Sequence, residues 1–196
     1  MDCDKILLSI KEDLTGQGVD CVFVPIDDLL HNKLLIYTGE NKKKLTQLIE
    51  IKVQTSEVNQ AIADGSGHDY ASFQLDAFFP LVVDDLAMSE VAQFLHFLNF
   101  QVEVPGFYLN YIDKTIVYRY VLLSESDHVP KKILLSLVGI AMFFQDVFGQ
   151  TLERLATGEV TFIQMMEEIQ KILEKVNTSK TNKNGKGSND GKGKHR

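Results

Sequence analysis

The sequence has few cysteines, and this limits the covalent chemistry that could hold it together. Its 196 residues include only Cys3 and Cys21, and they do not form a C-x-x-C spacing. Neither a disulfide framework nor a thiolate metal site is indicated, so a reducing compartment is the simpler expectation. No cofactor is implied.

Long hydrophobic runs and an export signal are also lacking. The longest nearly apolar run, residues 133–144, is about twelve residues long, short of the roughly 20 needed to cross a bilayer. The amino terminus carries acidic residues before its short apolar stretch, unlike the basic start of a signal peptide. We therefore expect no membrane span and a cytoplasmic location.

Basic residues are scarce outside the C-terminus. The formal net charge is −7, but residues 177–196 hold six Lys or Arg against one Asp, a local charge of +5. Subtracting that segment leaves −12 on the rest of the chain. Such a field repels nucleic-acid phosphates and favours basic or amphipathic partners, so we expect no nucleic-acid binding.

Motifs for catalysis or metal binding are missing as well. No H-E-x-x-H motif and no pair at helical spacing occurs among the five histidines, which are His31, His68, His96, His128 and His195. The Gly65-Ser66-Gly67 segment lacks the spacing of a nucleophile elbow. Adjacent acids such as Asp84-Asp85 point apart instead of converging on one bond. The sequence therefore predicts no catalytic, cofactor-binding or metal site, and a protein that is not an enzyme.

The sequence does contain enough apolar residues, 44%, for the core of one domain. Strand-like runs lie at residues 21–26, 33–37, 45–53, 73–83, 107–112 and 115–123, and helical spacing is found at residues 2–14, 88–99, 130–155 and 160–176. They predict an α+β fold, a twisted antiparallel sheet of about five strands with helices packed on it. We expect this domain at 1–157, a C-terminal amphipathic helix within 158–176, and a disordered basic tail at 177–196.

Two segments carry more specific expectations. Pro80 cannot donate a ladder hydrogen bond, so the strand at 73–83 should lie at a sheet edge or finish there. The helix at 130–155 is apolar over much of its circumference, which is typical of a helix buried between layers.

The order of elements from Phe73 onward includes a strand with the sequence Val117-Tyr118-Arg119-Tyr120. Over roughly 45–157 this order resembles the YbjN family and the fold it shares with class I type III secretion chaperones. For those chaperones the resemblance implies a homodimer whose exposed hydrophobic grooves hold an extended segment of a secretion client. The helix at 160–176 and the basic tail are additional to that pattern.

Eight residues are candidates for contacts with a protein partner, namely Phe73, Leu75, Phe78, Phe79, Tyr108, Arg119, Met165 and Met166. The apolar residues among them could equally be plain core. Alternation places Arg119 on the face opposite Tyr118 and Tyr120, where its stem could pack on the sheet with the guanidinium in water. An excess of apolar faces over what one small sheet can cover favours some intermolecular burial.

These observations predict a non-catalytic protein-binding module, a type III secretion chaperone-like protein that holds a client polypeptide and forms a possible homodimer. The alternative is a regulatory or assembly subunit that binds a folded partner through its C-terminal helix. Deletion of residues 160–176 separates the two hypotheses, because only the regulatory subunit should lose its partner.

Overall fold

The computed structural model describes residues 2–25, 32–54, 70–125 and 131–184. The strands are β1 (Cys21–Val24), β2 (Lys33–Glu40), β3 (Thr46–Gln54), β4 (Tyr70–Val82), β5 (Phe107–Asn110) and β6 (Thr115–Glu125). The helices are α1 (Cys3–Gly16), α3 (Met88–Gln101), α4 (Lys131–Ala156) and α5 (Phe162–Asn184), with a short 3-10 turn η1 (Asp85–Ala87) ahead of α3. The predicted α+β class is confirmed. The Gly65-Ser66-Gly67 segment and the tail from residue 185 onward lie outside the described residues.

The six strands form one antiparallel sheet in the order β1-β2-β3-β4-β6-β5. Each of the six strand-like runs of the sequence contributes one strand, where a sheet of about five was expected. The first four strands pair in chain order, and β6 then lies between β4 and β5. β5 and β6 form a hairpin, since Phe107 pairs with Tyr118 and Asn110 with Thr115. Both edge strands are only four residues long, which restricts pairing with other chains.

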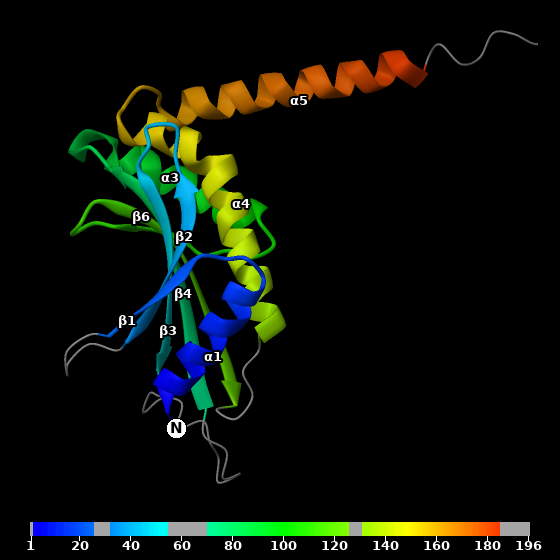
Figure 1. Cartoon of the computed structure of the whole chain (residues 1–196). Coiled ribbons are helices and arrows are strands. Elements are labelled where there is room, and N and C mark those ends of the chain that lie inside the picture. Colours follow the sequence, from blue (N-terminus) through cyan, green and yellow to red (C-terminus); the bar gives the residue numbers. More distant parts are fainter. Residues whose placement is uncertain (1, 26–31, 55–69, 126–130, 185–196) are drawn as a thin grey trace, which may run out of the picture.

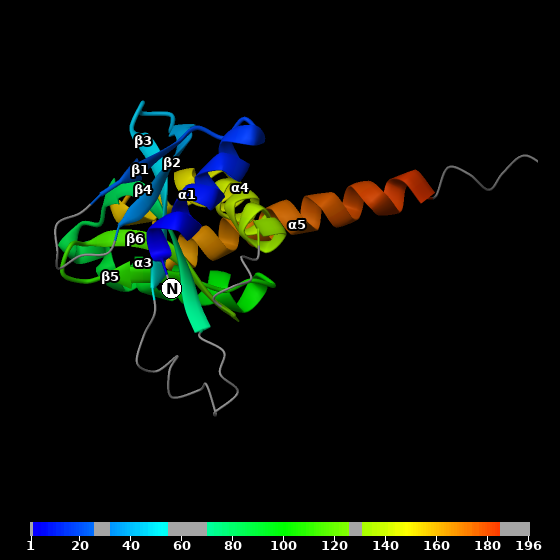
Figure 2. The same ribbon diagram turned by 60° about the horizontal axis from the view of Figure 1, so that its bottom comes forward.

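The helices that pack on the sheet lie on one side of it (Figures 1 and 2). α1 contacts β1 to β3, α4 crosses β3 and β4, and α3 lies over β5. Side chains of a strand alternate between its two faces, so Phe73, Leu75 and Phe79 of β4 are buried beneath this helical layer. No described helix covers the opposite face.

The strand that contains Pro80 is central, so the expectation that it lies at an edge is wrong. Its pairing with β3 ends at Phe78, and its pairing with β6 is irregular between Phe78 and Val82. Pro80 therefore lies at a bulge, where its missing N–H interrupts no regular ladder. The sequence also allowed regular strand pairing to finish near Pro80, and the observed pairing of β4 with β3 and β6 agrees with this second expectation.

α4 is buried on one side only, although a position between two layers was expected. Leu134 and Leu137 are buried against the rest of the domain. Phe143 and Val147, by contrast, are 59% and 48% exposed, because no described element packs outside this helix. By length and composition α4 could also cross a bilayer, a property that core helices of sheet proteins share.

α5 begins against the body of the protein and then projects away from it (Figure 1). The carboxylate of Glu90 in α3 accepts a 2.6 Å hydrogen bond from the backbone N–H of Phe162, and Arg154 of α4 bonds to Glu168 at 2.9 Å. The helix continues to Asn184, so its expected end at residue 176 is wrong. No proline or glycine occurs between Phe162 and Asn184 to stop it.

A buried glutamine connects α4 to three strands. The amide nitrogen of Gln145 donates to the carbonyl oxygens of Phe78, at 2.9 Å, and Leu48, at 3.3 Å. Its amide oxygen accepts a 2.9 Å hydrogen bond from the Thr38 hydroxyl. These groups lie where the strand pairing becomes irregular, so the side chain satisfies backbone oxygens at that point.

We expect Gln145→Leu to lower the free energy of unfolding by about 1–3 kcal/mol, because buried polar groups lose their partner. Gln150→Leu is the matched control, since Gln150 is an exposed glutamine of the same helix, and its effect should stay within about 0.5 kcal/mol. Urea denaturation followed by circular dichroism measures both. Equal stability of Gln145→Leu and the wild type would contradict this role.

Candidate functional site on the open face of the sheet

The sheet surface opposite the helices, called the open face below, is formed by the side chains that alternate with the core. Cross-strand pairing arranges these side chains in rows that run across the strands. Two neighbouring rows, one apolar and one charged, occupy the middle of this face. They form the candidate site.

The apolar row crosses five strands. Its members are consecutive cross-strand partners, Tyr37, Leu48, Phe78, Val117 and Tyr108. Tyr37 and Phe78 are 44% and 36% exposed, whereas Val117 is covered by its neighbours. Contiguous apolar surface left in contact with water marks interaction sites more often than scattered single residues do.

The charged row lies two residues away from the apolar row, in opposite chain directions on neighbouring strands. In it, Glu50 of β3 pairs with Asp76 of β4, and Asp76 pairs with Arg119 of β6. Two carboxylates directly opposite each other destabilise a sheet unless cations compensate them. Lys33 and Lys52 both contact Glu50, the former at 2.5 Å, and Arg119 compensates Asp76.

Arg119 connects the two rows. Its Nε and Nη2 donate to the two carboxylate oxygens of Asp76 at 2.5 and 2.9 Å, a bidentate pair. The Gln74 amide adds a 2.6 Å hydrogen bond to the same carboxylate. On its other side, the guanidinium lies 5.0 Å from the centre of the Tyr108 ring, within the range of a cation–π contact. The arginine is therefore fixed by groups from both rows.

The electrostatics of the open face follow from burial and these contacts. Burial alone would raise the pKa of Glu50, but hydrogen bonds from Lys33 and Lys52 outweigh it, and the pKa is lowered. The hydrogen bond to Asp76 raises the pKa of Arg119. Since the Asp76 side chain is 3% exposed and that of Arg119 42%, an approaching molecule meets mainly Arg119 in the charged row, with Lys33 and Lys52 in the next row.

Three of the predicted partner residues meet on the open face. Phe78 and Tyr108 belong to the apolar row, and Arg119 stands next to both of them in the sheet. From the sequence, the aliphatic part of Arg119 could pack on the sheet and leave the guanidinium in water. In the structure the guanidinium is partly exposed and forms an ion pair with Asp76.

The other five predicted residues do not lie on this surface. Phe73, Leu75 and Phe79 are core residues, because alternation along β4 sends them beneath the helices, and this is the alternative that the sequence left open for them. Met165 is buried at the base of α5. Met166 beside it is half-buried.

Sequence reasoning missed the carboxylates of the charged row. Asp76 lies 43 residues before Arg119, and their contact depends on the register between β4 and β6. A partial signal was available, because Asp76 alternates with Leu75 and therefore shares a face with Phe78. That signal gives the face but not the partner.

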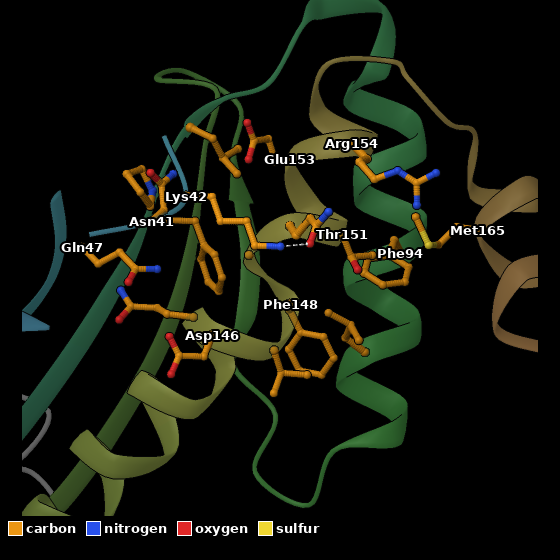
Figure 3. A pocket seen from close by; sticks show the side chains of 18 of the residues that line it. Asn41, Lys42, Gln47, Phe94, Asp146, Phe148, Thr151, Glu153, Arg154 and Met165 are labelled. Atoms are coloured by element: carbon orange, nitrogen blue, oxygen red, sulfur yellow. Dashed lines mark hydrogen bonds between the residues drawn. The ribbon is translucent and has the colours of Figure 1, made fainter. Parts of the chain in front are cut away.

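A cleft of about 710 Å³ lies on the helical side, between the β2–β3 turn, α3, α4 and the start of α5 (Figure 3). Phe94, Phe148 and Met165 are among its apolar lining residues. Lys42 crosses its entrance to bond with the Gln150 side chain at 2.5 Å. Among the described residues, no three His, Cys, Asp or Glu side chains gather in a way that could hold a metal ion.

A comparison of the chain with protein-family models gives no match, and a comparison with curated proteins gives none either. The resemblance to the YbjN family and to secretion chaperones therefore stays a prediction. Function has to be inferred from the surfaces of the molecule.

The Asp76–Arg119 pair gives a prediction for stability. Arg119→Ala leaves a buried carboxylate without its cation, and we expect a loss of about 2–4 kcal/mol in the free energy of unfolding. The double variant Asp76→Ala/Arg119→Ala removes both charges and should be more stable than Arg119→Ala alone. Urea denaturation of the three proteins tests this, and wild-type stability of Arg119→Ala would show that the pair does not stabilise the fold.

The lowered pKa of Glu50 predicts a pH dependence of stability. The unfolded chain takes up this proton at a higher pH than the folded chain does, so the stabilisation is complete above the usual value of 4.5 and is lost as the pH falls through the folded pKa. Between about pH 6 and pH 3, the wild type should lose more free energy of unfolding than Glu50→Gln loses. Parallel curves for the two proteins in chemical denaturation would contradict the assignment.

Proposed function

We propose that the protein binds an extended segment of another polypeptide on the open face of its sheet and catalyses no reaction. Support comes from a single observation: a partly exposed apolar row lies beside a row in which the carboxylates of Glu50 and Asp76 are buried and Arg119 is exposed, with Lys33 and Lys52 in the row after it. The narrower form of the proposal is a cytoplasmic chaperone that keeps a type III secretion client unfolded.

The spacing of the rows favours an extended occupant. Successive rows on one face are two residues apart along each strand, a distance of about 6.7 Å. Alternate side chains of an extended segment have the same spacing. A segment lying along the strands would therefore place one side chain over the apolar row, and the side chain two residues later, on the same side of the segment, over the charged row.

The charges favour an occupant with acidic side chains. The side chains of Lys33, Lys52 and Arg119 are 26%, 28% and 42% exposed, whereas those of Glu50 and Asp76 are 7% and 3% exposed. Carboxylates of the segment would meet these basic groups, and its apolar side chains would cover Phe78 and Tyr37. The expected ligand is a segment in which apolar and acidic residues alternate on one side.

Selection from a phage-displayed library of random dodecapeptides tests this proposal. Panning against the wild-type protein should enrich peptides in which an acidic residue lies two positions from an apolar residue, so that both side chains are on the same side of the extended peptide. Phe78→Ser should weaken the binding of a selected, fluorescein-labelled peptide by roughly tenfold or more, because a central apolar contact is lost.

Leu86→Ser is the matched control. Leu86 is 98% exposed in η1 and lies outside the sheet, so its replacement should leave peptide affinity unchanged. The proposal fails if no peptide is enriched, or if selected peptides bind Phe78→Ser as tightly as they bind the wild type.

A further inference from the structure

We infer that an extended segment of a polypeptide partner adds as a strand to the edge of β6 beyond the end of β5, and that this segment carries apolar residues. The site consists of main-chain groups at the edge of the sheet and lies apart from the apolar and charged rows of the open face. The inference therefore goes beyond the proposed function and does not rest on it.

β6 extends well beyond the strand that pairs with its outer edge. β5 covers β6 only from Thr115 to Tyr118, and one more main-chain bond, of 2.8 Å, runs from the N–H of Arg119 to the carbonyl oxygen of Gly106. On its other edge, β6 pairs with β4 as far as Glu125. The outer edge of β6 at residues 120–125, called the free edge below, therefore has no strand beside it in the part of the chain that the structure describes.

The bond from Arg119 shows which main-chain groups point to the free edge. Successive residues of a strand direct their N–H and C=O groups to opposite edges. The N–H of Arg119 points toward β5, and the pairing of β6 with β4 is regular from there to its end. The N–H and C=O groups of Val121 and Leu123 therefore point to the free edge, whereas those of Leu122 point to β4. Within the described ranges, no main-chain or side-chain group bonds to Val121 or Leu123 at this edge.

The neighbouring edge, that of β5, is closed by a side chain. Asn99 of α3 accepts a 2.9 Å hydrogen bond from the N–H of Phe107 and donates one of 2.8 Å to the carbonyl oxygen of the same residue. It thus bonds the outward groups of Phe107 in the way that a further strand would. Proteins commonly protect strand edges by such devices, and β6 lacks one at Val121 and Leu123 among the described residues.

The main-chain groups of the free edge specify the kind of molecule that can bind there. They recur at every second residue, about 6.7 Å apart, and another β-strand presents complementary groups at the same interval. A helix could not replace it, because its N–H and C=O groups are bonded within the helix. The occupant that fits is an extended polypeptide, bound by strand addition.

The side chains along the free edge favour apolar residues in the added strand. Val121 and Leu123 are 49% and 51% exposed on the open-face side, and their cross-strand partners on β4 are uncharged. On the helical side, Tyr120 and Leu122 are only partly buried. An added strand would lie beside apolar side chains on both faces, which suits β-branched and aromatic residues.

Amide hydrogen exchange, followed by NMR in heavy water, tests the free edge in the unmodified protein. The amides of Val121 and Leu123 should exchange at least about tenfold faster than that of Leu122, because only the last is bonded to β4. Equal protection of the three amides would overturn the inference.

A proline at the free edge provides the binding test. Random dodecapeptides are panned against the wild-type protein in the presence of excess soluble Val121→Pro, which lacks the outward N–H and blocks the edge with its ring. The enriched peptides should be apolar at several consecutive positions and should bind Val121→Pro at least about tenfold more weakly than the wild type. Val121→Thr is the matched control, since it keeps the N–H and the β-branched shape, and its affinity should stay within about threefold of the wild type.

Val121→Pro should fold, because the ladder with β4 does not use this N–H, and circular dichroism checks this. Loss of the native spectrum would show that the N–H belongs to a ladder and would overturn the inference.

Phe78→Ser separates this site from the open face. Peptides at the free edge should bind Phe78→Ser as tightly as they bind the wild type, and their binding should slow exchange of the Val121 and Leu123 amides by about tenfold or more. The inference is overturned if no peptide is enriched, or if the enriched peptides lose affinity for Phe78→Ser and keep it for Val121→Pro. The second result would assign those peptides to the open face and would support the proposed function.

Discussion

Coverage of only one face of the sheet is the constraint on which the rest of this structure depends. The helices α1, α3 and α4 form a single layer, so each central strand has one face in the core and the other in water. On the core face, alternate residues of β4 and β6 fill the space beneath the helices. On the other face, side chains still shield one another, and charged groups that become buried there need partners. The bidentate Asp76–Arg119 pair and the two lysines around Glu50 meet that need at the centre of the sheet.

The same constraint determines which surfaces are free for other molecules. The open face presents an apolar row next to basic groups, in rows that are regularly spaced along the strands. The helical layer has no second layer outside it, so α4 keeps an apolar outer side and α5 leaves the body with its own apolar side uncovered. Two distinct surfaces with different shapes result.

Local sequence patterns were sufficient for most of the fold. Apolar alternation and helical spacing located every helix and strand of the sheet, and the turn between β5 and β6 followed from two alternating runs separated by Asp113-Lys114. Errors arose where a local pattern was used for a long-range question. Pro80 indicated the end of regular pairing but not the central position of β4, which β6 creates by pairing from a distant part of the chain. The apolar circumference of α4 indicated a second covering layer that the described chain does not contain.

For the candidate site, too, local sequence patterns predicted some features, and others depended on long-range contacts. By itself, the sequence determined which residues form strands and helices and which side chains share a face, because periods of two and 3.6 residues are properties of the local backbone. It placed Arg119 on the face opposite Tyr118, but it could not tell that this face is open or that Asp76 is the partner. Only the tertiary structure decided those points, since strand register and the side on which helices pack depend on contacts between residues far apart in the chain. For that reason Phe78 lies on the surface and Phe79, the next residue, lies in the core.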